Sequence, residues 1–292
     1  MTTTLFVSNE TIQVVSGTAK GKKLIINDII TEPVKEGTII NGVITDSSQL
    51  KNDIDQIFKN NKKLGKKINV IVDGSSINTK ILEVPLLNEA KLMPFIETNY
   101  PEVENLDKML LDYMVLEGKN EAGGATVLSV LTEKDFVNEY SELITSLGIK
   151  IDSIDISLSS LIKLVKFGIK ALGETFIVGV LDKNILALVL FVRGKFRFSR
   201  RIRIVSEIGS EEILPEMVKI LSNMIQFNKS EKTNADISDI YIGGFLPADN
   251  EIYKQLTDSL DVNVVSFPEL ENIRIPDGRR QGDFIYTMGS IL

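Results

Sequence analysis

Residues 70–85 read VIVDGSSINTKILEVP. The apolar run from Ile68 to Val72 predicts a buried strand, and Thr79 to Val84 predicts a second strand after a polar turn. From Pro85 onward the pattern changes to that of a smaller α+β unit. The stretch therefore marks the point at which the chain leaves one domain and enters another.

Upstream of this stretch the pattern predicts three strands and a helix. The β-rich segments 5–7, 11–16 and 24–31 are separated by turn residues. Asp46 is the expected N-cap of the helix, with Gln49 in the capping-box position. Four apolar residues then recur at helical spacing on one face: Leu50, Ile54, Ile57 and Phe58.

The segment downstream of Pro85 predicts a helix, two strands, a second helix and a further strand. Asn88 is the expected cap of the first helix, where Pro94 either kinks the helix or marks its first turn. The strands are expected at 109–117 and 125–131, and the second helix starts at Thr132 and stops at Gly148. The unit leads into a strand at 150–156.

The last block repeats the plan of the first. Strands are expected at 176–181, 185–192 and 195–205, followed by a helix capped by Ser210. Another strand and helix pair, a strand and a short C-terminal helix complete the block; their residue ranges are 239–243, 251–260, 263–267 and 284–292.

Two strand-rich halves with this plan are typical of the actin, Hsp70 and sugar-kinase class. The predicted fold is therefore α/β and actin-like, with ribonuclease H-like duplicated lobes and a small α+β domain inserted in the first lobe. The expected domains are the first lobe at 1–84, the inserted domain at 85–150, the completion of the first lobe at 151–174 and the second lobe at 175–292.

The amino-acid composition limits the kinds of catalysis and of partner that the protein could have. The 292-residue chain contains no Cys, no His and no Trp, which excludes thiolate nucleophiles and histidine acid–base catalysis and disfavours zinc. The net charge of −7 does not suggest a nucleic-acid partner. The N-terminus lacks a basic signal region, and the most apolar window, 176–192, is interrupted by polar residues. We expect a cytoplasmic protein with no metal site and no catalytic residues.

Four segments, in order, carry a resemblance to a known family: 41–46, 70–85, Leu111-Asp112-Tyr113 and Gly243-Gly244. In order and spacing they resemble PilM, the actin-like family of type IV pilus assembly. The resemblance implies a protein at the inner face of the cell membrane, held there through partners of the pilus assembly machinery. It also implies a groove, between the first lobe and the inserted domain, for the N-terminal tail of a PilN-like membrane protein.

The resemblance further implies nucleotide between the lobes, held by two hairpin turns that each need a carboxylate and small residues. The family's first hairpin reads roughly Asp-Ile-Gly-Ser-Ser-Ser; here Phe6 stands at the carboxylate position and Ser8 at the glycine. In the second hairpin Val180 stands at the carboxylate position. We therefore expect no nucleotide, with ATP and Mg²⁺ as the alternative. The residues that would bind it are Ser8, Asn9, Glu10, Asp182, Asn184, Gly243 and Gly244.

Two other surfaces have both a functional and a structural interpretation. In the inserted domain, Met93 and Ile96 are the candidates for the partner groove, against the simpler interpretation of core residues. Between 193 and 203 lies the densest basic cluster, and strand parity predicts one basic and one apolar face. A solvated strand face is the simpler interpretation, and a dock for an acidic partner or anionic lipid is the functional one.

The predicted function is a non-catalytic scaffold of type IV pilus assembly that binds a PilN-like tail and leaves self-association open. Two alternatives remain: an active actin-like ATPase with an atypical pocket, and a GspL-like cytoplasmic domain of a type II secretion system.

Overall fold

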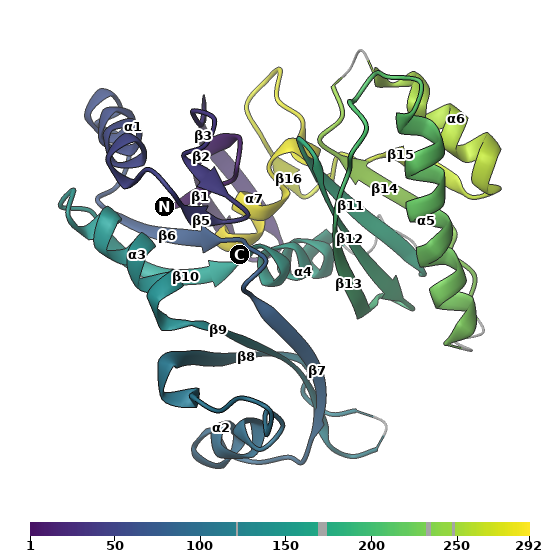
Figure 1. The fold of residues 1–292 in the computed structure, drawn as a ribbon, viewed down its shortest axis with the longest axis horizontal. Helices are drawn as coiled ribbons and strands as arrows, with labels where there is room; N and C mark the ends of the chain where they lie inside the picture. The colour runs from purple at the N-terminus through teal and green to yellow at the C-terminus, as the bar shows by residue number, and fades with distance from the viewer. Residues whose placement is uncertain (121, 169–173, 232–234, 247–248) are drawn as a thin grey trace. The chain divides into compact units, whose positions relative to one another are not determined.

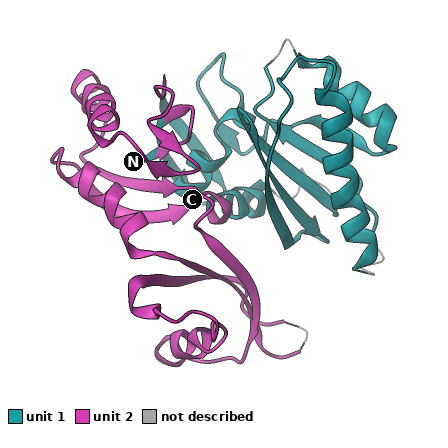
Figure 2. Ribbon diagram, viewed as in Figure 1, with its two compact units in different colours: residues 1–5, 13–31, 160–292 teal, residues 6–12, 32–159 magenta. Residues whose placement is uncertain are grey.

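The computed structural model describes residues 1–120, 122–168, 174–231, 235–246 and 249–292. The chain forms two compact units (Figure 2). The first comprises residues 1–5, 13–31 and 160–292, and the second comprises residues 6–12 and 32–159.

The first unit contains the N-terminal meander and the C-terminal segments of the chain (Figure 1). Strands β1, β2, β3 and β16 lie side by side in that order, and β16 runs parallel to β3. The bounds are β1 (Thr2–Val7), β2 (Thr11–Lys20), β3 (Lys23–Pro33), β16 (Ile273–Arg274), α4 (Ser157–Gly168), η4 (Gln281–Asp283) and α7 (Ile285–Ile291). A Cβ at Gly289 of α7 would lie 1.9 Å from the Ser160 carbonyl oxygen of α4, so only glycine allows this close helix crossing.

The same unit holds a five-stranded sheet with the order β13-β12-β11-β14-β15. Its elements are β11 (Phe176–Asp182), β12 (Ile185–Val192), β13 (Lys195–Arg203), α5 (Ile213–Ser230), β14 (Asp239–Gly243), α6 (Glu251–Leu260) and β15 (Asn263–Ser266). The α5 face of this sheet is apolar, with Leu186, Leu188 and Leu190 of β12 packed against Met217 and Leu221 of α5. The predicted order of strands and helices in this block is confirmed.

Two helix starts differ from the sequence prediction. Ser210 does not cap α5, which begins at Ile213 without a side-chain cap. The second helix of the insertion, α3 (Lys134–Thr145), does not start at Thr132, because that residue belongs to the strand β9 (Ala125–Glu133). Thr132 precedes the start of α3 by two residues, and Ser210 precedes the start of α5 by three.

The parity prediction for the basic strand is wrong, because β13 contains a β-bulge. Phe196 pairs with Phe191 of β12, whereas Phe198 pairs with Leu190, so the register shifts at Arg197. A bulge reverses the alternation of side chains beyond it. Phe198 accordingly stacks on Phe227 of α5, with ring centroids 4.4 Å apart, whereas Phe196 meets Phe191 edge-on.

The second unit is built on the parallel strands β6 and β10. Its elements outside the small sheet are β4 (Ile39–Ile40), β5 (Val43–Ile44), α1 (Ser47–Asn60), β6 (Lys67–Val72), α3 and β10 (Lys150–Ile156). Asp46 caps α1 as predicted, accepting the Gln49 backbone N–H at 3.0 Å. The Gln49 side chain does not complete the capping box; it donates to Asp53 instead.

A three-stranded antiparallel sheet with the order β7-β9-β8 forms the other part of this unit. Its elements are β7 (Asn78–Val84), α2 (Glu89–Glu97), η1 (Leu106–Lys108), β8 (Met109–Glu117) and β9. Asn88 caps α2, and the helix continues through Pro94, which excludes the interpretation of Pro94 as its first turn. β7 precedes the predicted domain boundary at residue 85 yet pairs along its whole length with β9. The domain boundaries themselves stay a prediction.

The turn Asn41-Gly42 joins β4 to β5 and lies against the quoted stretch 70–85. Gly42 has φ +87°, and a Cβ there would lie 2.0 Å from the Asp73 carbonyl oxygen. The buried Tyr140 hydroxyl of α3 donates to the Gly42 carbonyl at 2.6 Å. Burial, followed by the charges of Asp73 and Glu139, raises the pKa of Tyr140, so the hydroxyl keeps the proton that it donates.

The substitution Gly42→Ala should therefore destabilise the protein by about 2 kcal/mol or more, because it combines a positive φ with a backbone clash. Urea denaturation measures the change. The matched control is Gly118→Ala, where no atom lies within 4 Å and φ is not positive, and where a change within about 0.5 kcal/mol is expected. Equal stability of the two variants would contradict this account.

Candidate functional site

The first predicted phosphate hairpin closes upon itself. The Ser8 hydroxyl oxygen accepts the backbone N–H groups of Glu10 at 3.2 Å and Thr11 at 3.0 Å. In a phosphate-binding turn, such N–H groups would point at the ligand. Phe6, at the carboxylate position, is buried with 4% of its surface exposed. Serine in place of glycine thus supplies the turn with its own acceptor.

The same turn is held to the rest of its unit. The Glu10 carbonyl accepts the Val34 N–H at 2.6 Å, and the Asn9 side-chain oxygen accepts the Gly42 N–H at 3.4 Å. Ser8, Asn9 and Glu10 are consecutive residues of this turn, and their role in nucleotide binding stays a prediction. The hydrogen bonds of Ser8 with the Glu10 and Thr11 N–H groups are those of a closed turn.

The second group of predicted residues also gathers in one place. Val180 of β11 pairs with Gly243 of β14. Asp182 is the last residue of β11, and Asn184 lies in the β11–β12 turn that follows. A Cβ at Gly244, where φ is +102°, would lie 2.0 Å from the Leu181 carbonyl oxygen. A Cβ at Gly243 would lie 2.2 Å from the Gly282 carbonyl oxygen. Close backbone packing within the unit therefore accounts for both glycines.

The inserted-domain candidates do not share one environment. Ile96 is fully buried in the core of the small sheet with Leu92 and Tyr100, and Met93 packs on the edge of that cluster. Neither lines the cavity described next. Ile96 thus has no surface to offer a partner, because the apolar face of α2 is the one that covers β7 and β9.

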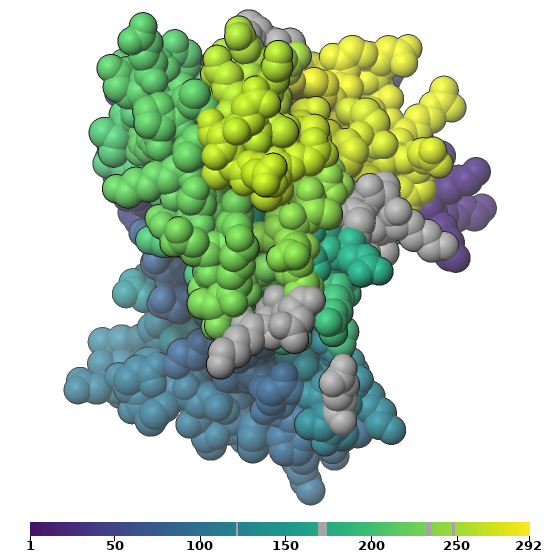
Figure 3. Space-filling view, turned by 90° about the vertical axis from the view of Figure 1, so that its right-hand side faces the viewer, coloured from purple at the N-terminus to yellow at the C-terminus, as the bar shows by residue number. Residues whose placement is uncertain are grey.

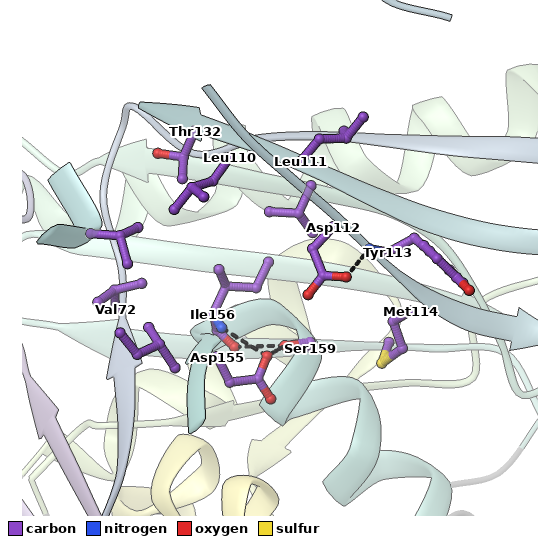
Figure 4. A pocket seen from close by; sticks show the side chains of 13 residues that line it. Val72, Leu110, Leu111, Asp112, Tyr113, Met114, Thr132, Asp155, Ile156 and Ser159 are labelled. Carbon is purple, nitrogen blue, oxygen red and sulfur yellow. Dashed lines mark hydrogen bonds between the residues drawn. The ribbon is translucent and has the colours of Figure 1, made fainter. Parts of the chain in front are cut away.

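A cavity of about 300 Å³ lies in the second unit, on the face of the small sheet opposite α2 (Figure 4). One side is formed by Leu110, Asp112 and Met114 of β8. Figure 4 shows the ends of β6 and β10 and the start of α4 on the other side. The lining residues are Val72, Leu110, Leu111, Asp112, Tyr113, Met114, Val130, Thr132, Val137, Ile154, Asp155, Ile156 and Ser159.

The polar groups of the cavity are few and mostly fixed. Asp155 accepts hydrogen bonds from the Ile156 N–H at 2.8 Å and from the Ser159 hydroxyl. Asp112 accepts the Tyr113 N–H at 2.7 Å. Thr132 differs, since its hydroxyl is buried and has no hydrogen-bond partner within the described residues. An apolar cavity with one unsatisfied hydroxyl is suited to a ligand that combines apolar side chains with a polar group.

The family resemblance implies a groove between the first lobe and the inserted domain, but the sequence does not identify the residues that line this cavity. Leu111-Asp112-Tyr113 belong to the segments that carry the resemblance, yet nothing in the sequence assigns them a role, and the expected groove residues lie on α2. Apolar residues occur on both faces of β8. Leu111 and Tyr113 pack toward α2, whereas Leu110 stays 38% exposed on the opposite face. An exposed apolar residue on the sheet face opposite the helix indicates that this face is a second packing surface.

Two further features bear on chemistry and membrane crossing. Among the described residues no group of three or more acidic side chains lies close enough to hold a metal ion. Within the same part of the chain, no helix has the length and apolar character needed to span a bilayer.

Comparison with solved structures shows the fold. The chain is similar to the PilM–PilN type IV pilus biogenesis complex, with TM-score 0.81 and 14% identity over 99% of this chain and 97% of that chain. A Bacteroides thetaiotaomicron protein with an actin-like ATPase fold matches with TM-score 0.54 and 12% identity over 90% of each chain. The cytoplasmic domain of EpsL from Vibrio cholerae matches with TM-score 0.54 and 8% identity over 99% and 94%. The predicted actin-like fold is thus confirmed.

A search of curated proteins gives no significant match. A family model does match: that of the type IV pilus assembly protein PilM, over residues 5–181, which is more than half of the chain. This model covers the meander, the stretch 70–85, the small sheet and the cavity. The chain belongs to the PilM family of type IV pilus assembly proteins.

Proposed function

We propose that this protein is a non-catalytic scaffold at the cytoplasmic face of the inner membrane, and that the cavity beside β8 binds the N-terminal tail of a PilN-like membrane protein. The observation that supports this most is the unsatisfied Thr132 hydroxyl in a mostly apolar cavity. The solved structure with TM-score 0.81 is itself a complex with PilN, which suggests the class of partner.

The cavity is suited to an extended peptide. β8 is the last strand of its sheet, with β9 on one side only, so its other edge is open to main-chain hydrogen bonds within the described residues. Five consecutive residues of β8, from Leu110 to Met114, line the cavity, which therefore follows the strand. Aliphatic side chains of a tail would fill the apolar part, and a peptide group would satisfy Thr132.

The substitution Leu110→Asp should weaken binding of a synthetic PilN-like tail at least about 10-fold, because it places a charge where an apolar contact forms. Fluorescence anisotropy of a labelled peptide measures this. The control is Val115→Asp on the same strand, since Val115 is 46% exposed and does not line the cavity. Equal loss in both variants would argue against the cavity as the binding site.

The substitution Thr132→Val should act on binding and stability in opposite directions. Removing the hydroxyl should stabilise the free protein by roughly 1 kcal/mol, because the variant no longer buries a polar group that has no partner. The same change should weaken the tail complex about fivefold, since the ligand loses a hydrogen bond. Denaturation and anisotropy on one variant test both, and unchanged affinity would exclude Thr132 as a ligand contact.

Absence of ATP hydrolysis is the second part of the proposal. It is supported by Phe6 and Val180 at the carboxylate positions and by the Ser8 hydroxyl that accepts the N–H groups of its own turn. Neither apolar side chain can hold Mg²⁺. Asp182 is the one carboxylate at the second turn that an active ATPase could still use.

Millimolar Mg-ATP should therefore leave the melting temperature of the protein unchanged, whereas the tail peptide should raise it, because only a ligand of the native state stabilises it. The peptide serves as the positive control in the same thermal-shift assay. ATP turnover that disappears on Asp182→Ala would establish the ATPase instead.

A further inference from the structure

Strand β13 and the turn before it carry the strongest positive charge in the chain. All six basic side chains there are exposed: Arg193, Lys195, Arg197, Arg200, Arg201 and Arg203. No Asp or Glu occurs between residues 183 and 206, although the chain as a whole has a net charge of −7. The charge of this unit is therefore strongly polarised.

The bulge at Arg197 decides how these cations are presented. Arg201 and Arg203 pair with Ala187 and Ile185 of β12, on the face away from α5. Arg200 pairs with Leu188, whose side chain belongs to the core on the α5 face. Basic side chains thus stand on both faces of the strand. β13 is the last strand of its sheet, and no other strand of the described part of the chain pairs with its outer edge, so the basic side chains surround this edge and do not form one solvated face.

This edge is poorly suited to an added peptide strand. A bulge and a row of like charges are the features that prevent strands from pairing at a sheet edge. Neither the cavity beside β8 nor the one between the starts of α5 and α6 includes a residue of β13. The β13 edge is therefore charged, but its residues line neither cavity. Such a surface recognises an extended anionic surface more readily than a particular side chain.

We propose that the β13 edge docks on the anionic phospholipid headgroups of a membrane. The long Arg and Lys side chains of both strand faces can reach past the edge to one plane, and each adds attraction there. Lipid docking does not itself depend on the tail.

Sedimentation of the full-length protein with vesicles tests the proposal, using phosphatidylcholine alone and phosphatidylcholine mixed with phosphatidylglycerol. The variant removes three charges, Arg197→Gln, Arg200→Gln and Arg203→Gln. The matched control removes three exposed charges elsewhere, Lys62→Gln, Lys63→Gln and Lys66→Gln, so both proteins have the same net charge. A third variant keeps the charge with lysine at positions 197, 200 and 203.

Binding is expected only with phosphatidylglycerol, and it should fall steeply with added salt. The β13 variant should lose roughly 100-fold in partitioning, at about fivefold for each charge, while the control and the lysine variant bind like the wild-type protein. Equal loss in the β13 and control variants, binding to phosphatidylcholine alone, or no vesicle binding would overturn the proposal. So would binding to poly-glutamate without binding to vesicles. Unchanged tail affinity of the β13 variant separates this result from the proposed function.

Discussion

The second unit depends on one backbone contact, that of the Asn41-Gly42 turn with Asp73 and Gly74 at the end of β6. Gly42 has no room for a side chain, and the Asn41 carbonyl accepts the Ser75 N–H at 3.3 Å. The Tyr140 hydroxyl of α3 donates a hydrogen bond to the Gly42 carbonyl of the same turn. The contact fixes where β6 ends, and Asp73 then accepts the Ser157 hydroxyl at the start of α4. Val72 and the α4 start, which form one side of the cavity, are positioned as a result.

The turn around Ser8 and the Thr132 hydroxyl of the cavity differ in whether their polar groups have hydrogen-bond partners. Within the PilM family the chain keeps an actin-like fold, but the turn around Ser8 uses its own backbone N–H groups. These N–H groups therefore have an acceptor without a phosphate, whereas the Thr132 hydroxyl lacks a partner in the described residues. Since an unsatisfied buried group costs free energy, a ligand that formed a hydrogen bond with Thr132 would be stabilised by that contact. The buried hydroxyls of Ser76, Ser160 and Ser210 likewise have no partner within the described residues.

Much of the fold was predictable because it rests on local patterns. The apolar run at 68–72, the helical spacing after Asp46 and the Asn88 cap specify elements from neighbouring residues alone, and the structure contains them. The candidate nucleotide residues were also brought together in two groups as their positions in the hairpins indicate. The predicted helix start at Thr132 is wrong because the strand β9 continues through that residue. The predicted start at Ser210 is wrong because residues 211 and 212 form a turn before α5 begins at Ile213.

Residue identity and short-range periodicity are enough to predict the order of elements and to exclude Cys and His chemistry. They also put Phe6 and Val180 where the family resemblance places carboxylates. Which apolar faces are covered depends on the tertiary structure. Ile96 is enclosed by β7 and β9, whereas Leu110 remains open beside the cavity, although both are apolar residues in regular elements. The bulge at Arg197 likewise arises from pairing with β12. Burial and register depend on residues distant in the chain, so no local pattern encodes them.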